Sequence, residues 1–331
     1  MTFRAIYLEK DDAGATHASV RVLDESALPA SDGTVTIAVA YSTMNYKDAL
    51  AITGRSPVVR RFPMVPGVDL AGSVVDSRSA LWRPGDEVVL NGWGAGESWW
   101  GGLAERASVK DGWLIRLPGS VTAFDAMAVG TAGFTAALSV MAIEAHGVRP
   151  GDGDVLVTGA TGGVGSLAIL LLAAGGYRVI ASTGKLHDQE YLQQLGAAGV
   201  IDRATLSEPG KPLQAERWAA AIDAVGSHTL ANVCASTRAD GIVAACGLAQ
   251  GMDFPSTVAP FILRGVTLAG INSVQVPVDR RVAAWEKIAR LVDRTRLHGL
   301  SHEIGLAEAI SAAPDILAGT LRGRLVVNVA R

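Results

Sequence analysis

A glycine-rich turn, "VTGATGGVGS" at 157–166, constrains this chain more than any other feature. Residues 155–157 before the turn are typical of a buried strand, and "SLAILLLAA" from Ser166 onward is typical of a helix. Glycine allows a tight turn and lets the backbone approach a bound group closely. A strand, a glycine turn and a helix in this order predict a dinucleotide-binding turn, although a tight turn without a ligand would use the same glycines.

Helices and strands alternate on both sides of this turn. We expect strands at 155–158, 178–182, 199–201, 219–223, 241–245 and 266–270, and helices at 123–145 (broken near Gly130), 164–174, 188–195 and 227–235. Strands that alternate with helices predict a parallel, doubly wound sheet.

The first 120 or so residues have a different pattern, with short strand-like runs at 35–40, 72–75, 87–90 and 113–116 separated by turn residues. A helix is expected at 282–292, and a closing strand at 323–329 should return to the first sheet. A chain of 331 residues suggests two domains. We therefore expect a β-rich domain over 1–122, completed by 275–331, and an α/β nucleotide-binding domain over 123–274.

Composition narrows the functional classes. Hydrophobic residues make up 49% of the chain and charged residues 18%, which is typical of a globular protein. A net charge of -3 gives no electrostatic footprint for nucleic acid, and the most apolar helix-like run, 167–174, is too short to span a bilayer. Two cysteines, Cys234 and Cys246, argue against a disulfide framework and favour a cytoplasmic protein. We expect neither a membrane nor a nucleic acid as partner.

The strand after the turn indicates which dinucleotide binds. An NAD site commonly carries an acidic residue at the end of this strand, where it binds the ribose 2′-hydroxyl. Here the strand ends in Ser182, Thr183, Gly184 and Lys185, so hydroxyls and an ammonium group are available for a 2′-phosphate. A helix cap with a solvated lysine would explain the same residues. Together with the missing acid, they favour NADPH over NADH.

Several further stretches carry a family resemblance: "NYKDALAITG" (45–54), "FPMVPGVDLAG" (62–72), "GWGAGESWWGGLAE" (92–105), "GTAGFTA" (130–136), "AACGLA" (244–249) and "RGRLVV" (322–327). With the glycine turn, they resemble the zinc-free, quinone-oxidoreductase-like branch of the medium-chain dehydrogenase/reductases. Within that branch they most closely resemble the NADPH-dependent acrylyl-CoA reductases. The resemblance covers essentially the full length. It implies a GroES-like catalytic domain and a Rossmann NADPH-binding domain with the active site in the cleft, reduction of acrylyl-CoA to propionyl-CoA, and a homodimer.

This chain differs from zinc-dependent relatives in the segments where they carry metal ligands. Those relatives carry an early cysteine and a His-Glu pair near the "PG" turn, where this chain has Asn45-Tyr46-Lys47-Asp48 and Gly67-Val68-Asp69. A catalytic zinc needs three Cys, His or carboxylate ligands and an open position. We therefore expect no metal.

Reduction of an enoyl thioester by hydride transfer to the β-carbon places negative charge on the thioester oxygen, and donors aimed at that oxygen lower the barrier. Tyr46 is our candidate donor, beside the cofactor and the substrate, and packing alone is the alternative role for this tyrosine. Asn45 and Asp48 are expected to hold the "NYKD" loop. The source of the proton for the α-carbon stays open.

Other residues are carried over from the resemblance as cofactor contacts. In the glycine turn they are Thr161, Gly162, Gly163 and Val164; elsewhere they are Thr131, Val225, Cys246, Gly247, Leu248, Asn272, Ser273 and Arg324. An ordinary surface arginine is an equally good interpretation of Arg324. Basic residues that could meet the CoA phosphates, on composition alone, are Arg55, Arg60, Arg61, Arg280 and Arg281.

Two alternatives remain open. The same scaffold could reduce a quinone or another α,β-unsaturated carbonyl, because the substrate is chosen by the site and not by the fold. A non-catalytic NADPH-binding protein is the alternative from another class, and Tyr46 within an intact "NYKD" segment argues against it.

Overall fold

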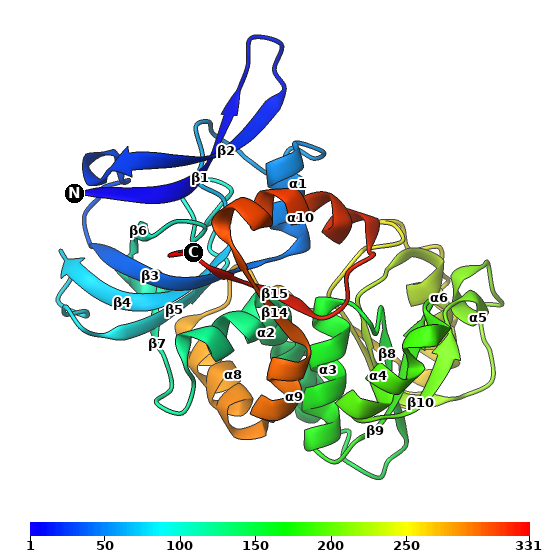
Figure 1. The fold of residues 1–331 in the computed structure, drawn as a ribbon. Helices are drawn as coiled ribbons and strands as arrows, with labels where there is room; N and C mark the ends of the chain where they lie inside the picture. Colours follow the sequence, from blue (N-terminus) through cyan, green and yellow to red (C-terminus); the bar gives the residue numbers. More distant parts are fainter. The chain divides into compact units, whose positions relative to one another are not determined.

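The computed structural model describes residues 1–331, which form two compact units (Figure 1). Unit 1 comprises Met1–Thr131, Ser273–Ala289 and Leu297–Arg331, and unit 2 comprises Ala132–Asn272 and Arg290–Arg296. The division falls inside the long helix α2 (Ala123–His146), at the position where its backbone departs from helical geometry.

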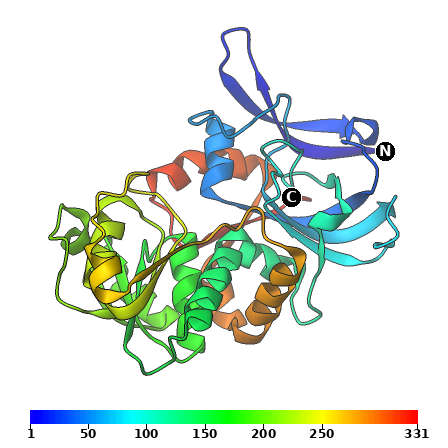
Figure 2. The same cartoon turned by 180° about the vertical axis from the view of Figure 1, so that it is seen from behind.

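Unit 1 is built on a seven-stranded sheet with the order β14-β15-β3-β4-β5-β7, and β6 pairs with β3. A separate hairpin is formed by β1 (Thr2–Lys10) and β2 (Thr16–Asp24). The last strand of the chain pairs antiparallel with β3, with Leu325 opposite Met44, so strands from early and late parts of the sequence share one sheet (Figure 2). The sheet strands are β3 (Thr34–Met44), β4 (Asp69–Ser77), β5 (Glu87–Asn91), β6 (Arg106–Lys110), β7 (Ile115–Arg116), β14 (Ser301–Gly305) and β15 (Arg324–Asn328).

Helices cover this sheet and close its core. Helix α1 (Tyr46–Thr53) packs against α10 (Leu306–Ala318), and apolar side chains from both join Ile37, Leu70 and Leu90 of the strands. Helices α8 (Val278–Leu291) and α9 (Arg294–Gly299) lie between β13 and β14 in the sequence.

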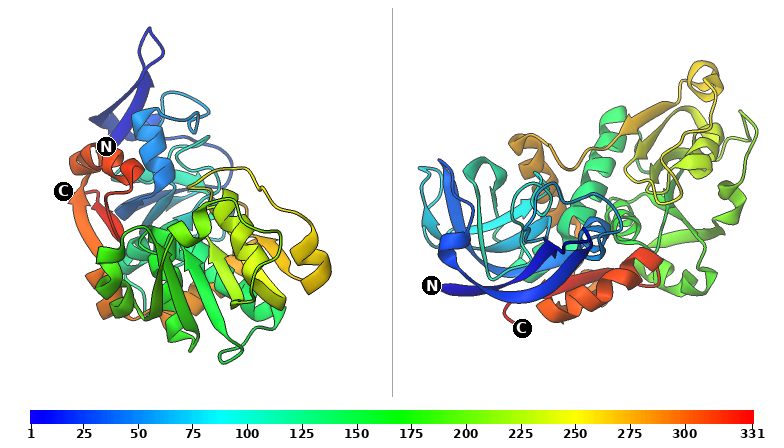
Figure 3. Two further views of the ribbon diagram at one scale, coloured as in Figure 1. Left: turned by 90° about the vertical axis from the view of Figure 1, so that its right-hand side faces the viewer. Right: turned by 90° about the horizontal axis from the view of Figure 1, so that it is seen from above.

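Unit 2 contains a six-stranded, fully parallel sheet with the order β10-β9-β8-β11-β12-β13. Helices α3 and α4 contact β8, β9 and β10, whereas α6 contacts β11 and β12 (Figure 3). This is the order of a doubly wound Rossmann sheet, with the switch point between β8 and β11, and it confirms the predicted fold class. The strands are β8 (Asp154–Thr158), β9 (Arg178–Thr183), β10 (Ala197–Asp202), β11 (Trp218–Asp223), β12 (Thr237–Ala245) and β13 (Thr267–Gly270); the helices are α3 (Gly163–Ala174), α4 (Gln189–Leu195), α5 (Ala204–Ser207), α6 (Ser227–Ser236) and α7 (Ala259–Arg264).

Helix α2 is long and apolar enough to cross a membrane by length and composition. However, 83% of its most apolar window is buried inside the protein, so it is a core helix. At Gly130 the backbone has φ 52° and ψ -162°, which interrupts the helix as the sequence predicts. The positive φ at this break favours glycine.

Two local expectations are wrong. The "NYKD" segment, expected to be a loop, begins helix α1, because Asn45 and Asp48 form a capping box and Gly54 ends the helix in the left-handed conformation. The strand expected at 113–116 shrinks to the two residues of β7, because Asp111–Trp113 form a 3-10 turn.

Candidate functional site

The glycine turn joins the carboxyl end of β8 to the start of α3 in unit 2. Gly162 is the N-cap, and no side chain caps the helix. The amides of the first helical turn have no acceptor within the helix, so they are free for an anion. At Gly165 an added Cβ would lie 2.3 Å from the carbonyl oxygen of Gly159, which shows how closely the helix approaches the turn. Thr161 and Gly162 lie in this turn and Gly163 and Val164 begin α3, and their contacts with a cofactor stay predictions.

The neighbouring loops follow β11 and β12 at the same edge of the sheet. Asp223, at the end of β11, accepts hydrogen bonds from Thr158 Oγ1 (2.6 Å) and from the backbone N–H groups of Val225 (3.2 Å) and Gly226 (2.8 Å). Burial raises the pKa of Asp223 above its usual value, and these three donors oppose that shift. The carboxyl group therefore ties the Val225 loop to β8.

Cys246 lies directly after β12, and its backbone N–H donates to the carbonyl oxygen of Asp223 (2.8 Å). Burial, and then the charge of Asp223, raises the pKa of its thiol to about 12, which disfavours the thiolate form. Leu248, two residues further on, is exposed.

The segment that follows β9 carries the residues predicted to select the cofactor. The hydroxyl of Ser182 is buried and has no hydrogen-bond partner. Thr183 Oγ1 accepts a hydrogen bond from the backbone N–H of Lys185 (3.0 Å), which leaves the hydroxyl proton of Thr183 available. A buried hydroxyl without a partner is costly unless a ligand satisfies it. Residues 182–185 and the glycine turn, which has no capping side chain, together fit a dinucleotide that carries a 2′-phosphate.

In unit 1, the start of α1 holds the three predicted catalytic residues. Asp48 is buried; its Oδ2 accepts from the backbone N–H of Asn45 (2.9 Å), and its Oδ1 accepts from the N–H groups of Gly67 (3.1 Å) and Val68 (3.0 Å). Burial, and then the charge of Asp69, raises the pKa of Asp48 to about 6. Tyr46 is 57% exposed, and its hydroxyl makes no hydrogen bond. The capping box of Asn45 and Asp48 thus fixes the backbone conformation at Tyr46.

Asp69 is the central polar residue of unit 1, although its sequence context predicts no role for it. Its fully buried carboxylate accepts four hydrogen bonds. Oδ1 accepts from Thr131 Oγ1 (2.5 Å) and Asn91 Nδ2 (2.7 Å), and Oδ2 accepts from the backbone N–H of Thr131 (2.8 Å) and Asn45 Nδ2 (2.8 Å). Its only sequence signal is its place directly after Gly67-Val68, where the zinc-dependent relatives carry their His-Glu pair.

Arg324 is buried and hydrogen-bonds residues around the start of α1 and the break in α2. Its guanidinium donates to Thr43 Oγ1 (2.8 Å), to Asn45 Oδ1 (3.2 Å) and to the carbonyl oxygen of Ala128 (3.1 Å). Burial lowers its pKa, and the carboxylate of Asp69 opposes that shift. The interpretation of Arg324 as a surface arginine is therefore wrong, and its contact with a cofactor stays a prediction.

Arg281 is also buried, which corrects its inclusion among the basic residues available to a CoA phosphate. Its guanidinium donates to the carbonyl oxygens of Val276 (2.9 Å), Asn91 (2.7 Å) and Val274 (2.8 Å), and lies 4.5 Å from the ring centre of Trp93. Burial lowers the pKa of Arg281 to about 10. The remaining candidates are exposed: Arg55, Arg60, Arg61 and Arg280.

Two predicted cofactor contacts follow β13. Asn272 ends the first segment of unit 2, and Ser273 begins the second segment of unit 1. Their roles as cofactor contacts stay predictions.

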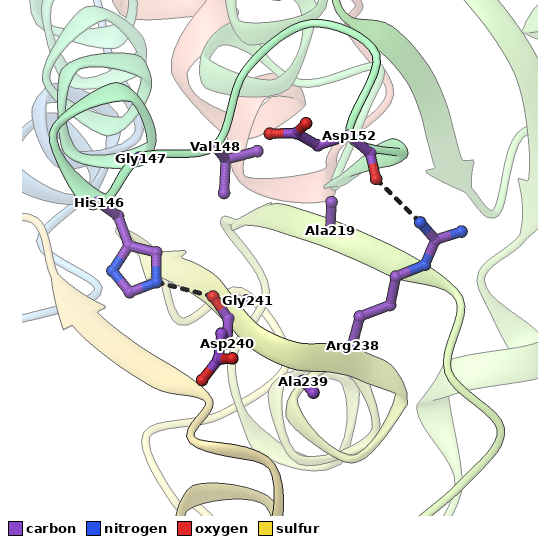
Figure 4. A pocket seen from close by; sticks show the side chains of 9 residues that line it. All are labelled: His146, Gly147, Val148, Asp152, Ala219, Arg238, Ala239, Asp240 and Gly241. Carbon is purple, nitrogen blue, oxygen red and sulfur yellow. Dashed lines mark hydrogen bonds between the residues drawn. The ribbon is translucent and has the colours of Figure 1, made fainter.

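A cavity of about 280 Å³ lies elsewhere in unit 2 (Figure 4). His146 Nε2 lies 2.9 Å from the carbonyl oxygen of Asp240, and Arg238 Nη1 donates to that of Asp152 (3.0 Å). These residues stand at or before the amino ends of β8 and β12. Ligands of doubly wound sheets bind at the carboxyl ends of the strands, so this cavity is not the dinucleotide site.

Two family descriptions match the sequence. Residues 31–119 match "Alcohol dehydrogenase GroES-like domain", and residues 163–294 match "Zinc-binding dehydrogenase". No group of three or more His, Cys, Asp or Glu side chains in the structure is placed to hold a metal ion.

Curated relatives match over nearly the whole chain. The "Probable acrylyl-CoA reductase AcuI" of Escherichia coli is 49% identical over 98% of this chain and 99% of its own. The "Putative quinone oxidoreductase YhfP" of Bacillus subtilis is 43% identical over 99% of each chain.

Solved structures with the same fold contain nicotinamide dinucleotides. The yhdH oxidoreductase from Salmonella enterica, in complex with NADP, has a TM-score of 0.96 and 48% identity, and covers 99% of this chain and 100% of its own. Bacillus subtilis yhfP, with NAD bound, has a TM-score of 0.95 and 42% identity, and covers 99% of this chain and 100% of its own.

Proposed function

This chain belongs to the medium-chain dehydrogenase/reductase superfamily, and from this premise we propose that it is an NADPH-dependent reductase of a short enoyl-CoA. The proposed reaction is reduction of the carbon–carbon double bond of acrylyl-CoA, giving propionyl-CoA, without a metal. The observation that carries the proposal is 49% identity with the probable acrylyl-CoA reductase of Escherichia coli along 98% of the chain.

The residues of unit 2 hold the cofactor in this proposal. The free amides at the start of α3, those of Gly163 and Val164, bind its pyrophosphate, whereas the N–H of the N-cap residue Gly162 donates to the carbonyl oxygen of Gly159 (3.0 Å). The hydroxyls of Ser182 and Thr183 and the ammonium group of Lys185 bind the 2′-phosphate. NADPH, when bound, supplies the hydride. Further contacts proposed for it are Tyr46, Thr131, Thr161, Val225, Cys246, Leu248, Asn272, Ser273 and Arg324.

In unit 1, Tyr46 is the proposed catalytic residue. Its exposed hydroxyl, which has no partner within the chain, donates a hydrogen bond to the thioester oxygen as negative charge grows there. Asn45 and Asp48 do not touch the substrate in this scheme; they fix the first turn of α1 and hence the direction of the Tyr46 side chain. The segments where zinc-dependent relatives carry metal ligands read Asn45-Tyr46-Lys47-Asp48 and Gly67-Val68-Asp69 here, and the carboxylate of Asp69 is fully used by four donors.

We further propose a cytoplasmic homodimer. Strand β13 is the edge strand of the unit 2 sheet, and α7 beside it in the sequence exposes Ile262 (73%) and Leu263 (69%). An open strand edge next to exposed apolar side chains is typical of a surface that another chain covers. Both cysteines are free thiols, which fits a reducing compartment.

A substrate panel tests the activity. NADPH oxidation is followed by absorbance with acrylyl-CoA, crotonyl-CoA and a quinone at equal concentrations, and each assay is repeated with NADH. We expect the highest kcat/KM with acrylyl-CoA and NADPH. A higher value with the quinone would instead support the second candidate, quinone reduction, which the 43% identity with the Bacillus subtilis protein favours. No turnover with any substrate would support a non-catalytic NADPH-binding protein.

A further inference from the structure

We propose that Glu97 is a positioning residue, whose carboxylate pairs with Lys47 and thereby holds the first turn of α1 in the orientation that Tyr46 needs for catalysis. This inference rests on the proposed function and extends it to the connection between β5 and β6, residues 92–105, in which the site described above has no member. Glu97 does not touch the substrate in this scheme and acts only through α1.

An ion pair joins the β5–β6 connection to the residue that follows Tyr46. Lys47 Nζ donates to Glu97 Oε1 (2.7 Å), and 50 positions of sequence separate the two residues. The Glu97 side chain is 19% exposed and that of Lys47 is 39% exposed, so water screens this pair less than it screens a fully exposed one. Because Lys47 is the second residue of α1, the pair holds the start of the helix.

The backbone of the β5–β6 connection holds Glu97 in place. The N–H of Glu97 donates to the carbonyl oxygen of Gly94 (3.1 Å), and its own carbonyl oxygen accepts from the N–H of Arg60 (2.7 Å). At Gly96, where φ is 75°, an added Cβ would lie 2.8 Å from the backbone nitrogen of Gly67. Glycine permits both this φ and this close approach of two backbone segments. The carboxylate of Glu97 is therefore presented to Lys47 from a fixed backbone.

Two contacts consequently hold adjacent residues in the first turn of α1. Asp48 Oδ1 accepts a hydrogen bond from the N–H of Gly67, and Lys47 pairs with Glu97. The two segments that supply these contacts also touch each other, where Gly96 approaches Gly67. The helix start and the two segments therefore form a closed ring of contacts, and removal of the ion pair opens this ring.

The orientation of Tyr46 depends on the first turn of α1, because no partner within the chain holds its hydroxyl. The tyrosine side chain is exposed and its hydroxyl makes no hydrogen bond. Helix α1 has only eight residues, and a helix this short relies on tertiary contacts to keep its form. A donor lowers the barrier only when it is already in place as charge develops, so a small displacement of Tyr46 costs rate.

Glu97→Ala removes the acceptor of the ion pair. Steady-state kinetics with acrylyl-CoA and NADPH should show kcat lowered about 10-fold, because a misplaced donor loses its contact in the transition state. KM for acrylyl-CoA should change less than about twofold, since every proposed substrate contact is kept. Glu97→Gln keeps an acceptor without charge and should lose less of kcat. Urea should unfold the wild type and both variants at nearly the same midpoint, because a partly exposed ion pair contributes little to stability.

A double-mutant cycle with Tyr46→Phe shows whether Glu97 acts through Tyr46. Once the hydroxyl is absent, Glu97→Ala should lower kcat no further. Glu25→Ala is the matched control, because Glu25 pairs with Arg106 (3.2 Å) in the same unit, with side chains that are 31% and 30% exposed. Its kcat should equal that of the wild type. Equal losses in Glu97→Ala and Glu25→Ala, or a full further loss in the double variant, would overturn the role of Glu97.

A measurement without turnover separates this inference from the proposed function. The chain has five tyrosines, so labelling with fluorotyrosine gives five fluorine NMR resonances, and the one lost in Tyr46→Phe belongs to Tyr46. Glu97→Ala should shift this resonance, whereas Glu25→Ala should not. If the shift occurs but the wild type does not reduce acrylyl-CoA, the proposed function fails and the positioning of Tyr46 by Glu97 stands. An unshifted Tyr46 resonance in Glu97→Ala refutes the positioning role whatever the substrate is.

Discussion

Thr131 donates two hydrogen bonds to Asp69, one from Oγ1 to Oδ1 (2.5 Å) and one from its backbone N–H to Oδ2 (2.8 Å). The break in α2 at Gly130 turns this backbone N–H away from the helix ladder and toward the carboxylate. Because Asn45 donates to the same carboxylate, Asp69 joins the interruption of α2 to the start of α1. The start of α1 and the break in α2, two segments that the sequence suggests as functional, are thus both held by the buried carboxylate of Asp69.

Asp69→Asn should destabilise the protein and lower its activity. Each carboxylate oxygen accepts two donors, so an amide in either orientation leaves two donors facing an NH₂ group. Buried donors without acceptors cost about 1 to 3 kcal/mol each. We expect a loss of about 2 to 4 kcal/mol in the free energy of unfolding, measured with urea. Asp76→Asn, at an exposed position of the same strand, should change it little; equal losses in both variants would contradict the role given to Asp69.

Asp48 should make stability depend on pH in the direction opposite to that of most carboxylates. Its pKa is raised from 3.8 to about 6, so the folded state holds this proton more tightly than the unfolded state. The contribution of Asp48 is therefore fully present below pH 3.8 and is lost as the pH rises through about 6. The shift corresponds to about 3 kcal/mol.

Urea unfolding of the wild type and of Asp48→Asn at pH 4.5 and pH 7.5 separates this effect from that of other acids. The asparagine variant loses an acceptor at both pH values but carries no titrating group. Its stability relative to the wild type should improve at the higher pH. An unchanged difference between the two proteins would mean that Asp48 titrates normally.

The fold of unit 2 can be predicted from the sequence because its parallel strands are buried on both faces. Runs such as 155–157 and 219–222 are apolar throughout, and glycine or polar residues separate them from the helices. Helix α1 cannot be predicted from periodicity, because it has only eight residues and too few turns to show a helical period. Its signals are local: Asn45, Asp48 and Gly54 together mark a capped helix.

The polar centre of unit 1 could not be predicted in the same way. An aspartate within a strand is expected to face solvent, and the burial of Asp69 depends on donors 24, 22 and 62 positions away in the sequence. Non-local pairing therefore decides which of these polar residues meet.

Tyr46→Phe should lower kcat for acrylyl-CoA about 100-fold and leave the affinity for NADPH nearly unchanged, because it removes only the donor to the developing charge. The hydroxyl of Tyr46 is unbonded and 57% of the residue is exposed, so the free energy of unfolding should change by less than about 0.5 kcal/mol. Tyr191→Phe is the control, since it removes a hydroxyl bonded to Ser166 (3.0 Å) in unit 2. An undiminished kcat in Tyr46→Phe would reduce Tyr46 to a surface aromatic.

Gly165→Ala tests whether close packing at the glycine turn is needed to bind the dinucleotide. The added methyl group would lie 2.3 Å from Gly159 O and 2.7 Å from Ala160 Cα, and neither backbone atom can move without displacing α3 from the turn. We expect a loss of about 1 to 3 kcal/mol in stability and at least a tenfold weaker binding of NADPH by calorimetry. Gly175→Ala, at the other end of the same helix, is the control, because its Cβ would meet no atom nearer than 3.3 Å. Equal NADPH affinities in the two variants would show that the turn tolerates a side chain at position 165 and that its amides do not determine binding.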